Sequence, residues 1–142
     1  MKSAKNRLWI CLMATAVIGL TVATAPLHAQ TVPLRVDIPF AFHAGDSTLP
    51  AGIYTVARKG DAISVTDGNG HSAVIIASAI ANASKGAANE IAFNNYAGSY
   101  FLTEVRWNGY RDARGLVKSK MELELAAKAA QHETVKLAAV TR

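Results

Sequence analysis

The residues with the clearest capacity to recognise a ligand lie in one basic and aromatic stretch near the end of the chain. Within fifteen residues, this stretch holds Arg106, Trp107, Tyr110, Arg111, Arg114, Lys118 and Lys120. Arginines beside aromatic rings can bind anionic polymers or sugars, because the guanidinium group pairs with acidic groups and stacks on aromatic faces. The predicted ligand-binding residues are Arg106, Trp107, Tyr110, Arg111 and Arg114, and the expected partner is an envelope polymer or polysaccharide. The alternative is a solvated turn followed by the first turn of a helix.

The histidines lack the spacing of a metal site. After Ala29 they are His43, His71 and His132, which are far apart and have no cysteine near them. A metal site needs several ligands at short spacings or brought together by the fold. His43 and Asp46 fit a turn histidine beside an Asx turn. The run Asp67-Gly68-Asn69-Gly70 resembles part of a calcium loop but lacks the downstream Glu. We therefore predict neither a metal nor another cofactor.

The sequence holds no complete catalytic motif. Gly70-His71-Ser72-Ala73-Val74 begins like the nucleophile motif G-x-S-x-G, but it ends in Val and does not join a strand to a helix. Asp61 and Asp67 flank a short predicted strand, where turn formation is a commoner role than acid and base catalysis. The glycines are spread over predicted hairpins and form no phosphate-binding loop. We predict that the protein is not an enzyme.

The segment from Met1 to Ala29 has the pattern of a signal peptide. Three basic residues precede an apolar run over residues 8–22, and Leu27-His28-Ala29 before Gln30 is similar to an A-x-A cleavage site. The alternative is an uncleaved membrane anchor, for which about 20 apolar residues are needed. The run is shorter than that, so we expect cleavage near Ala29. The expected location is the periplasm or the extracellular space, with membrane contact only during export.

Composition limits the class of the chain that remains after cleavage, from Gln30 to Arg142. Three of the 15 Lys and Arg precede Gln30, which leaves 12 Lys and Arg against 10 Asp and Glu. This mild positive charge does not favour nucleic acid as a partner, because domains that bind nucleic acid are commonly strongly basic. The one cysteine, Cys11, lies in the predicted signal peptide. A domain of this size without disulfides is expected to depend on a packed core.

Alternating apolar residues predict that this domain is built of β-strands. The first stripe is Leu34, Val36, Ile38, Phe40 and Phe42. A period of two over this whole stripe is typical of a strand with one buried face. Pro39 interrupts the other face and cannot donate a hydrogen bond, so this strand is expected at a sheet edge or with a bulge.

Further strands are predicted at five places, joined by Gly- and Asp-rich turns. They cover residues 53–58, 62–66, 71–77, 91–96 and 100–107. Short turns between such runs favour an antiparallel meander and a second hairpin. The run over residues 73–77 is apolar on both faces, which predicts a central strand. Phe101, Val105 and Trp107 are expected on one face of the last strand. Residues 43–52 are expected to be a turn, and residues 78–89 a mobile connection.

The last quarter of the chain changes to a helical pattern. Ser119 and Glu122 form a capping box, and Met121, Leu125, Ala129 and His132 follow at a spacing close to that of a helix face. A helix is therefore predicted at about residues 119–132. Residues 134–140 are either a last strand or a frayed tail.

Together these patterns predict a signal peptide over residues 1–29 and a single mainly-β domain over residues 30–142. The domain is expected to have six or seven antiparallel strands over about residues 33–107, as a small barrel or sandwich, and one C-terminal helix. The leading functional hypothesis is an exported non-enzymatic protein with a structural or binding role. The second is a carrier or binder of an apolar or carbohydrate ligand, either at the basic and aromatic stretch over residues 106–120 or inside a barrel. The barrel cavity would be lined by Phe40, Phe42, Phe93, Phe101 or Trp107.

Four motifs also resemble the signatures of a bacterial protein family. Residues 38–45 are similar to P-F-x-F followed by a glycine, and residues 49–56 to L-P-A-G-x-Y-x-V. Residues 100–104 are similar to Y-F-L-x-E, and Ser119 with Glu122 to a closing S-x-x-E. Over about residues 34–124 the chain thus resembles a family of small secreted β-rich proteins of environmental bacteria. The resemblance implies a secreted β domain and no particular activity, ligand or catalytic residue. Pro50 and Gly52 of the second motif fit a tight entry to a strand.

Overall fold

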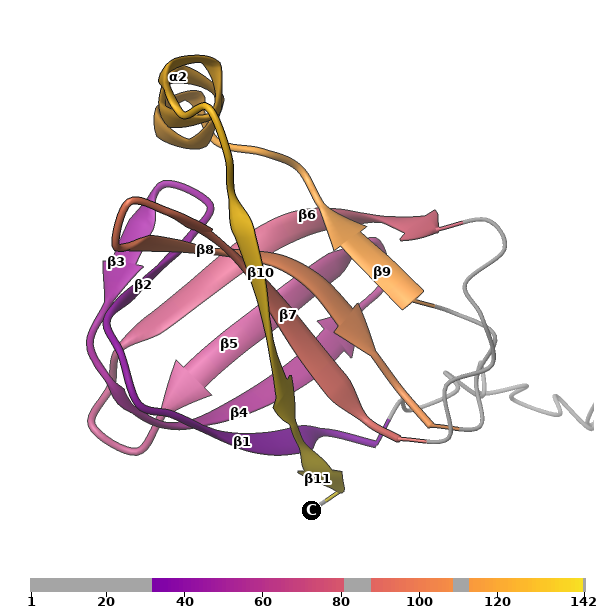
Figure 1. Cartoon of the computed structure of the whole chain (residues 1–142). Helices are drawn as coiled ribbons and strands as arrows, with labels where there is room; N and C mark the ends of the chain where they lie inside the picture. Colours follow the sequence, from indigo (N-terminus) through magenta and orange to yellow (C-terminus); the bar gives the residue numbers. More distant parts are fainter. Residues whose placement is uncertain (1–31, 81–87, 109–112, 142) are drawn as a thin grey trace, which may run out of the picture.

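A computed structural model of the chain describes residues 32–80, 88–108 and 113–141, and most of these residues lie in β-strands (Figure 1). The mainly-β prediction is confirmed. The predicted signal peptide and its cleavage site lie outside the described residues, as does most of the predicted connection over residues 78–89. The helix found among the described residues is not long and apolar enough to cross a membrane.

The described residues form eleven strands and one helix. The strands are β1 (Leu34–Ile38), β2 (Phe42–Ala44), β3 (Ser47–Leu49), β4 (Gly52–Lys59), β5 (Ala62–Asp67), β6 (Ser72–Ile80), β7 (Glu90–Tyr96), β8 (Ser99–Arg106), β9 (Ala113–Leu116), β10 (Glu133–Ala138) and β11 (Val140–Thr141). The helix, α2, covers Lys120–Lys128. Hydrogen-bonded neighbours follow the order β10-β7-β8-β9-β6-β5-β4-β1-β11, and β2 pairs with β3 and β8. Figure 1 shows β7, β8 and β10 crossing in front of β4, β5 and β6 in a sandwich-like arrangement.

The first apolar stripe supplies part of the core, but it forms two strands instead of one. Leu34, Val36 and Ile38 of β1 are buried, and the residues between them are exposed. β1 ends before Pro39, and β2 pairs with β3 and β8 instead of β4. Because proline has no N–H to donate to a ladder, this position suits the point where the chain leaves one layer for the other.

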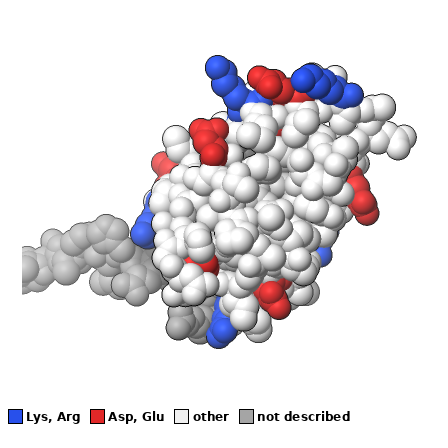
Figure 2. Space-filling view, turned by 90° about the vertical axis from the view of Figure 1, so that its left-hand side faces the viewer, with Lys and Arg blue, Asp and Glu red and all other residues white. Residues whose placement is uncertain are grey.

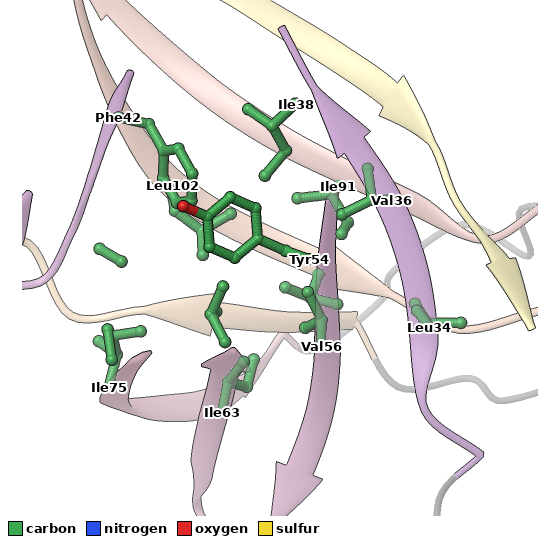
Figure 3. Close-up of a cluster of buried hydrophobic side chains, with 14 of the residues drawn as sticks. Leu34, Val36, Ile38, Phe42, Tyr54, Val56, Ile63, Ile75, Ile91 and Leu102 are labelled. Atoms are coloured by element: carbon green, nitrogen blue, oxygen red, sulfur yellow. The ribbon is translucent and has the colours of Figure 1, made fainter. Parts of the chain in front are cut away.

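Aromatic side chains meet inside the molecule (Figure 3). The ring of Phe42 makes edge contacts with Tyr54 at 5.2 Å and with Phe93 at 5.4 Å between centroids. Phe40 contacts Phe93 in the same manner at 5.3 Å and stacks on Tyr100 at 3.9 Å. Side chains that were expected to line a cavity therefore contact one another, and such edge-to-face pairs add to the stability gained by burial.

The predicted meander is confirmed, with one correction to its third strand. β4, β5 and β6 are successive antiparallel neighbours, and β6 lies between β5 and β9. Its central position agrees with the prediction from its apolar residues. Only one face is buried, however, since Ile75 is 6% exposed and Ile76 is 70% exposed. The sequence predicted burial on both faces because Val74 and Ile76 are apolar, although both side chains are exposed.

A bulge in β8 changes which of its side chains face the core. Ala92 pairs with Glu104 and Phe93 pairs with Leu102, so Thr103 is an extra residue on β8. The Thr103 hydroxyl donates to the Ala92 carbonyl at 3.1 Å. An extra residue reverses the alternation of side chains beyond it. Leu102 therefore belongs to the main core with Val105 and Trp107, whereas the buried Phe101 lies outside it.

Four short strands raise the number above the six or seven that were expected. β2 and β3 form a hairpin within residues 43–52, where the sequence suggested only a turn. β9 contains Gly115 and Arg114 and so has no apolar alternation. Of residues 134–140, all but Ala139 fall in strands, because β10 pairs with β7 and β11 pairs with β1.

The helix has the predicted start but a different buried face. The Ser119 hydroxyl accepts a hydrogen bond from the Glu122 N–H at 3.2 Å, as expected for an N-cap. The helix ends at Lys128, however, and so is shorter than the predicted range of residues 119–132. Met121, the first member of the predicted apolar stripe, is exposed. Glu122 is the buried residue of the helix.

Candidate functional site

Of the predicted arginine and aromatic site residues, the structure describes Arg106, Trp107 and Arg114. Trp107 is 3% exposed, and its indole N–H donates to the Val32 carbonyl at 3.1 Å. The Arg106 guanidinium contacts the Glu104 carboxylate at 2.7 Å. Arg114 is 8% exposed. Tyr110 and Arg111 lie outside the described residues.

The strand register accounts for the positions of these two arginines. Arg106 lies opposite Glu90, which pairs with Lys136 at 3.1 Å, so charges of alternating sign cross β10, β7 and β8. Arg114 lies opposite Val105, a core residue, and its Nε is buried without a hydrogen-bond partner among the described residues. The described part of the predicted site thus takes part in packing and ion pairs.

A groove of about 400 Å³ opens on another part of the surface. It is lined by Arg35, Ile53, Thr55, Gly68 and Asn69. Arg35 of β1 and Thr55 of β4 are directly opposite in the antiparallel ladder, and both lie on the face that points away from the core. The turn between β5 and β6 contributes Gly68 and Asn69. We refer to these five residues as the groove.

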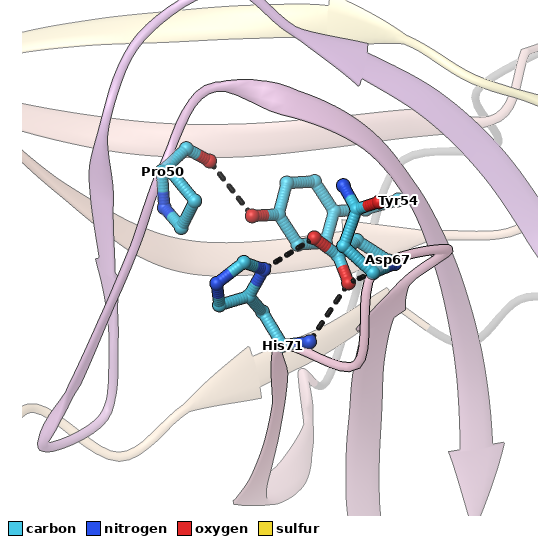
Figure 4. Close-up of polar contacts among 5 residues, drawn as sticks. Pro50, Tyr54, Asp67 and His71 are labelled. Atoms are coloured by element: carbon cyan, nitrogen blue, oxygen red, sulfur yellow. Dashed lines mark hydrogen bonds and ion pairs between the residues drawn. The ribbon is translucent and has the colours of Figure 1, made fainter.

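Asp67 fixes the turn that forms one wall of the groove (Figure 4). Its carboxylate accepts hydrogen bonds from the N–H of Asn69 at 2.9 Å and the N–H of His71 at 2.8 Å. The His71 Nδ1 lies 2.6 Å from the other carboxylate oxygen. Because an ionised carboxylate only accepts, the imidazole carries the hydrogen at Nδ1. The prediction that Asp67 forms a turn is confirmed.

Electrostatics keeps Asp67 ionised and Tyr54 neutral. Burial by itself raises the pKa of Asp67, but hydrogen bonds from the His71 ring and the Asn69 and His71 amides, with the His71 charge, bring it below its usual value. The pKa of Tyr54 is raised, first by burial and then by the Asp67 charge. The Tyr54 hydroxyl donates to the Pro50 carbonyl at 2.7 Å. Both polar groups thus serve to hold the backbone beside the groove.

The groove offers binding groups of several kinds. Arg35 is exposed and makes no ion pair among the described residues, so its guanidinium fork is open to a ligand. Thr55 and Asn69 add a hydroxyl and an amide, and Ile53 adds an exposed apolar surface. Arg35 is the one ionisable side chain in its lining. These groups are suited to holding a polar or anionic molecule against an apolar surface.

A second polar cluster lies beneath α2. The Tyr96 hydroxyl is 3.5 Å from Glu122 Oε1, and the Asn94 amide donates to the Tyr96 hydroxyl at 3.4 Å. The His132 ring lies 5.5 Å from that of Tyr96 between centroids. Burial raises the pKa of Glu122, while Lys118, Asn94, Tyr96 and His132 act in the opposite direction. Glu122 is 3% exposed, so this cluster joins the helix to the sheet.

The histidines take structural positions. His43 Nδ1 lies 3.0 Å from the Thr48 hydroxyl, and its ring stacks on Phe101 at 4.6 Å. Within the part of the chain that the structure describes, no group of three or more His, Cys, Asp or Glu residues is arranged to hold a metal ion.

The groove residues were missed by the sequence analysis for a physical reason. The period-two pattern places Arg35 on the outer face of its strand, but Thr55 and Asn69 approach it only through the pairing of β1 with β4 and the turn after β5. Comparison of the chain with known proteins found no matching protein-family model, curated sequence or solved structure.

Proposed function

We propose that the protein is an exported, non-enzymatic binding protein whose ligand is a polymer of the cell envelope and whose binding site is the groove. The observation that carries the proposal is the Arg35 guanidinium, which lies without an ion pair among the described residues beside the Thr55 and Asn69 side chains. Support for export comes from the sequence pattern between Met1 and Ala29.

The composition of the groove favours binding over catalysis. General acid and base chemistry needs titratable groups that converge on a substrate. The groove has one charged side chain, that of Arg35, and otherwise neutral ones. Asp67 and His71 are nearby in the chain, but Asp67 is engaged in three hydrogen bonds that hold the turn.

Most of the surface around the turn is uncharged (Figure 2). Figure 2 shows the side of the molecule on which β2, β3 and the turn between β5 and β6 lie, with most of that face uncharged and a few charged side chains spread over it and along its margin. Hydroxyl and amide groups beside an apolar side chain can recognise the polar edge and the C–H face of a sugar ring.

The alternative of a carrier with a ligand inside a barrel has less support. Four of the five aromatic residues proposed to line its cavity are buried, and Phe42 and Phe93 contact each other. Filling of the interior by side chains reduces the room for a ligand there.

Retention of the purified protein on insoluble envelope material tests the proposal. We expect the wild type to be retained and Arg35→Ala to be lost to the wash, whereas Lys128→Ala, which removes an exposed cation on α2, keeps full retention. Equal retention of the wild type and Arg35→Ala would refute the groove as the site. Loss in Arg111→Ala with normal retention of Arg35→Ala would instead support the arginine cluster predicted from the sequence.

A further inference from the structure

The outer face of the sheet continues the groove as a row of polar side chains in register. Arg35 of β1 is opposite Thr55 of β4, Thr55 is opposite Thr66 of β5, and Thr66 is opposite Ser72 of β6. We call Arg35, Thr55, Thr66 and Ser72 the polar row. Neighbouring strands are about 4.8 Å apart, so four strands give a row about 14 Å long.

Burial of the adjacent residues shows that the polar row faces outward. Val36, Val56, Val65 and Ala73, each next in sequence to one member of the row, are buried in the core. Successive side chains in a strand point to opposite faces, so the row lies on the outer face. Arg35, Thr66 and Ser72 are exposed, and Thr55 is half-buried at the groove.

We infer that the ligand is an acidic polysaccharide that lies along the polar row, with a carboxylate on Arg35 and sugar hydroxyls on Thr55, Thr66 and Ser72; this inference rests on the proposed binding function. A guanidinium group binds a carboxylate through two parallel hydrogen bonds. Hydroxyl side chains both donate and accept, which matches the hydroxyls of a sugar. The exposed Ile53 gives a sugar ring an apolar contact at the groove end of the row.

The charges near the row make the inference specific. Asp37 lies on the same outer face as Arg35, two residues along β1, so its carboxylate opposes the binding of an anion. Asp67 is one residue along β5 from Thr66, on the other face, and its carboxylate contacts His71. Removal of the Asp37 charge should therefore strengthen the binding of an acidic polymer and leave a neutral polymer unaffected.

The test compares polygalacturonate with its methyl-esterified form of the same length, titrated into the full protein and followed by calorimetry. We expect polygalacturonate to bind more tightly than the ester, and its affinity to fall as salt is raised. Arg35→Ala should weaken polygalacturonate binding about tenfold or more, equivalent to about 1.4 kcal/mol. Asp37→Asn should tighten it.

Matched hydroxyl variants test the row itself. Thr66→Val and Ser72→Ala should each weaken binding a few-fold, whereas Ser78→Ala, which removes a hydroxyl from the same exposed face of β6 beyond the row, should have no effect. Equal effects of Ser72→Ala and Ser78→Ala would overturn the placement along the row.

The outcomes separate this inference from the proposed function. Equal binding of the two polymers, with no effect of Asp37→Asn, would overturn the acidic ligand while retention of the wild type on envelope material, and its loss in Arg35→Ala, still supported the groove. Loss of both the polymer binding and the Arg35-dependent retention would overturn both.

Discussion

The hydroxyl oxygen of Tyr96 lies 3.5 Å from Oε1 of Glu122, although 26 residues separate them in the chain. Tyr96 belongs to β7 and Glu122 to α2, and both side chains are buried. The helix therefore meets the sheet through a carboxyl group, whereas its apolar Met121 and Leu123 are exposed. Burial of an ionised carboxylate is costly, which makes this contact sensitive to pH.

Stability should depend on the ionisation of Glu122. Burial raises its pKa above the ordinary value of 4.5, so the folded protein holds the proton more tightly than the unfolded chain does. The stabilising contribution of this group is complete below the unfolded pKa and is lost as pH rises through the folded pKa. Glu122→Gln should therefore have a higher urea midpoint than the wild type at neutral pH, with a difference that shrinks in acid. A constant difference across the pH range would contradict the burial of the charged group.

Asp67 should show the opposite pH dependence. Hydrogen bonds in the turn lower its pKa below 3.8, so its contribution is present above the unfolded pKa and is lost as pH falls through the folded pKa. Asp67→Asn should move the amide-proton resonances of Asn69 and His71 and weaken polymer retention, because the turn forms one wall of the groove. Asp61→Asn, in the turn between β4 and β5, is the control. The same resonance changes in both variants would rule out a specific role for Asp67.

Two adjacent isoleucines of β6 test its orientation. Ile75 packs in the core and Ile76 is exposed. Ile75→Ala should lower the free energy of unfolding by about 2 to 5 kcal/mol, because it removes buried methylenes and leaves a cavity. Ile76→Ala should change it by no more than about 0.5 kcal/mol. Urea denaturation of both variants measures the difference, and similar losses would contradict the orientation of the strand.

Much of the fold was predictable because strand periodicity is a local property. Leu34, Val36 and Ile38 alternate in the sequence and are buried as expected, and the turns after Lys59 and Asp67 produced the expected antiparallel neighbours. The sequence placed Phe101 on the same face as Val105. This was wrong because the extra residue at Thr103 reverses the alternation of side chains along β8, and no residue type marks that position. Local periodicity cannot detect a bulge that depends on the partner strand.

The candidate site was harder to predict because it depends on pairing between strands. Arg35 and Thr55 are far apart in the chain and meet only through their register. The sequence predicted Arg106 and Trp107 as parts of one site because they are neighbours in the chain, but adjacent residues of a strand point to opposite faces. Trp107 is accordingly in the core, and Arg106 pairs with Glu104 on the outer face.

The predicted signal peptide can be tested directly by the N-terminus of the protein. Material purified from the periplasm or the culture medium should begin at or within a few residues of Gln30, since the pattern before it is similar to a cleavage site. Edman sequencing or intact-mass measurement gives the answer. A protein that begins at Met1 in the membrane fraction would support the anchor alternative.

The most direct test of the account is an NMR titration of the protein with solubilised envelope polymer. We expect the amide resonances of Arg35, Thr55 and Asn69 to move together in a saturable manner, and those of Arg106 and Trp107 to stay unchanged. Saturable shifts confined to residues around Arg106 and Arg114, or the lack of any saturable shift, would contradict the assignment of the groove as the binding site.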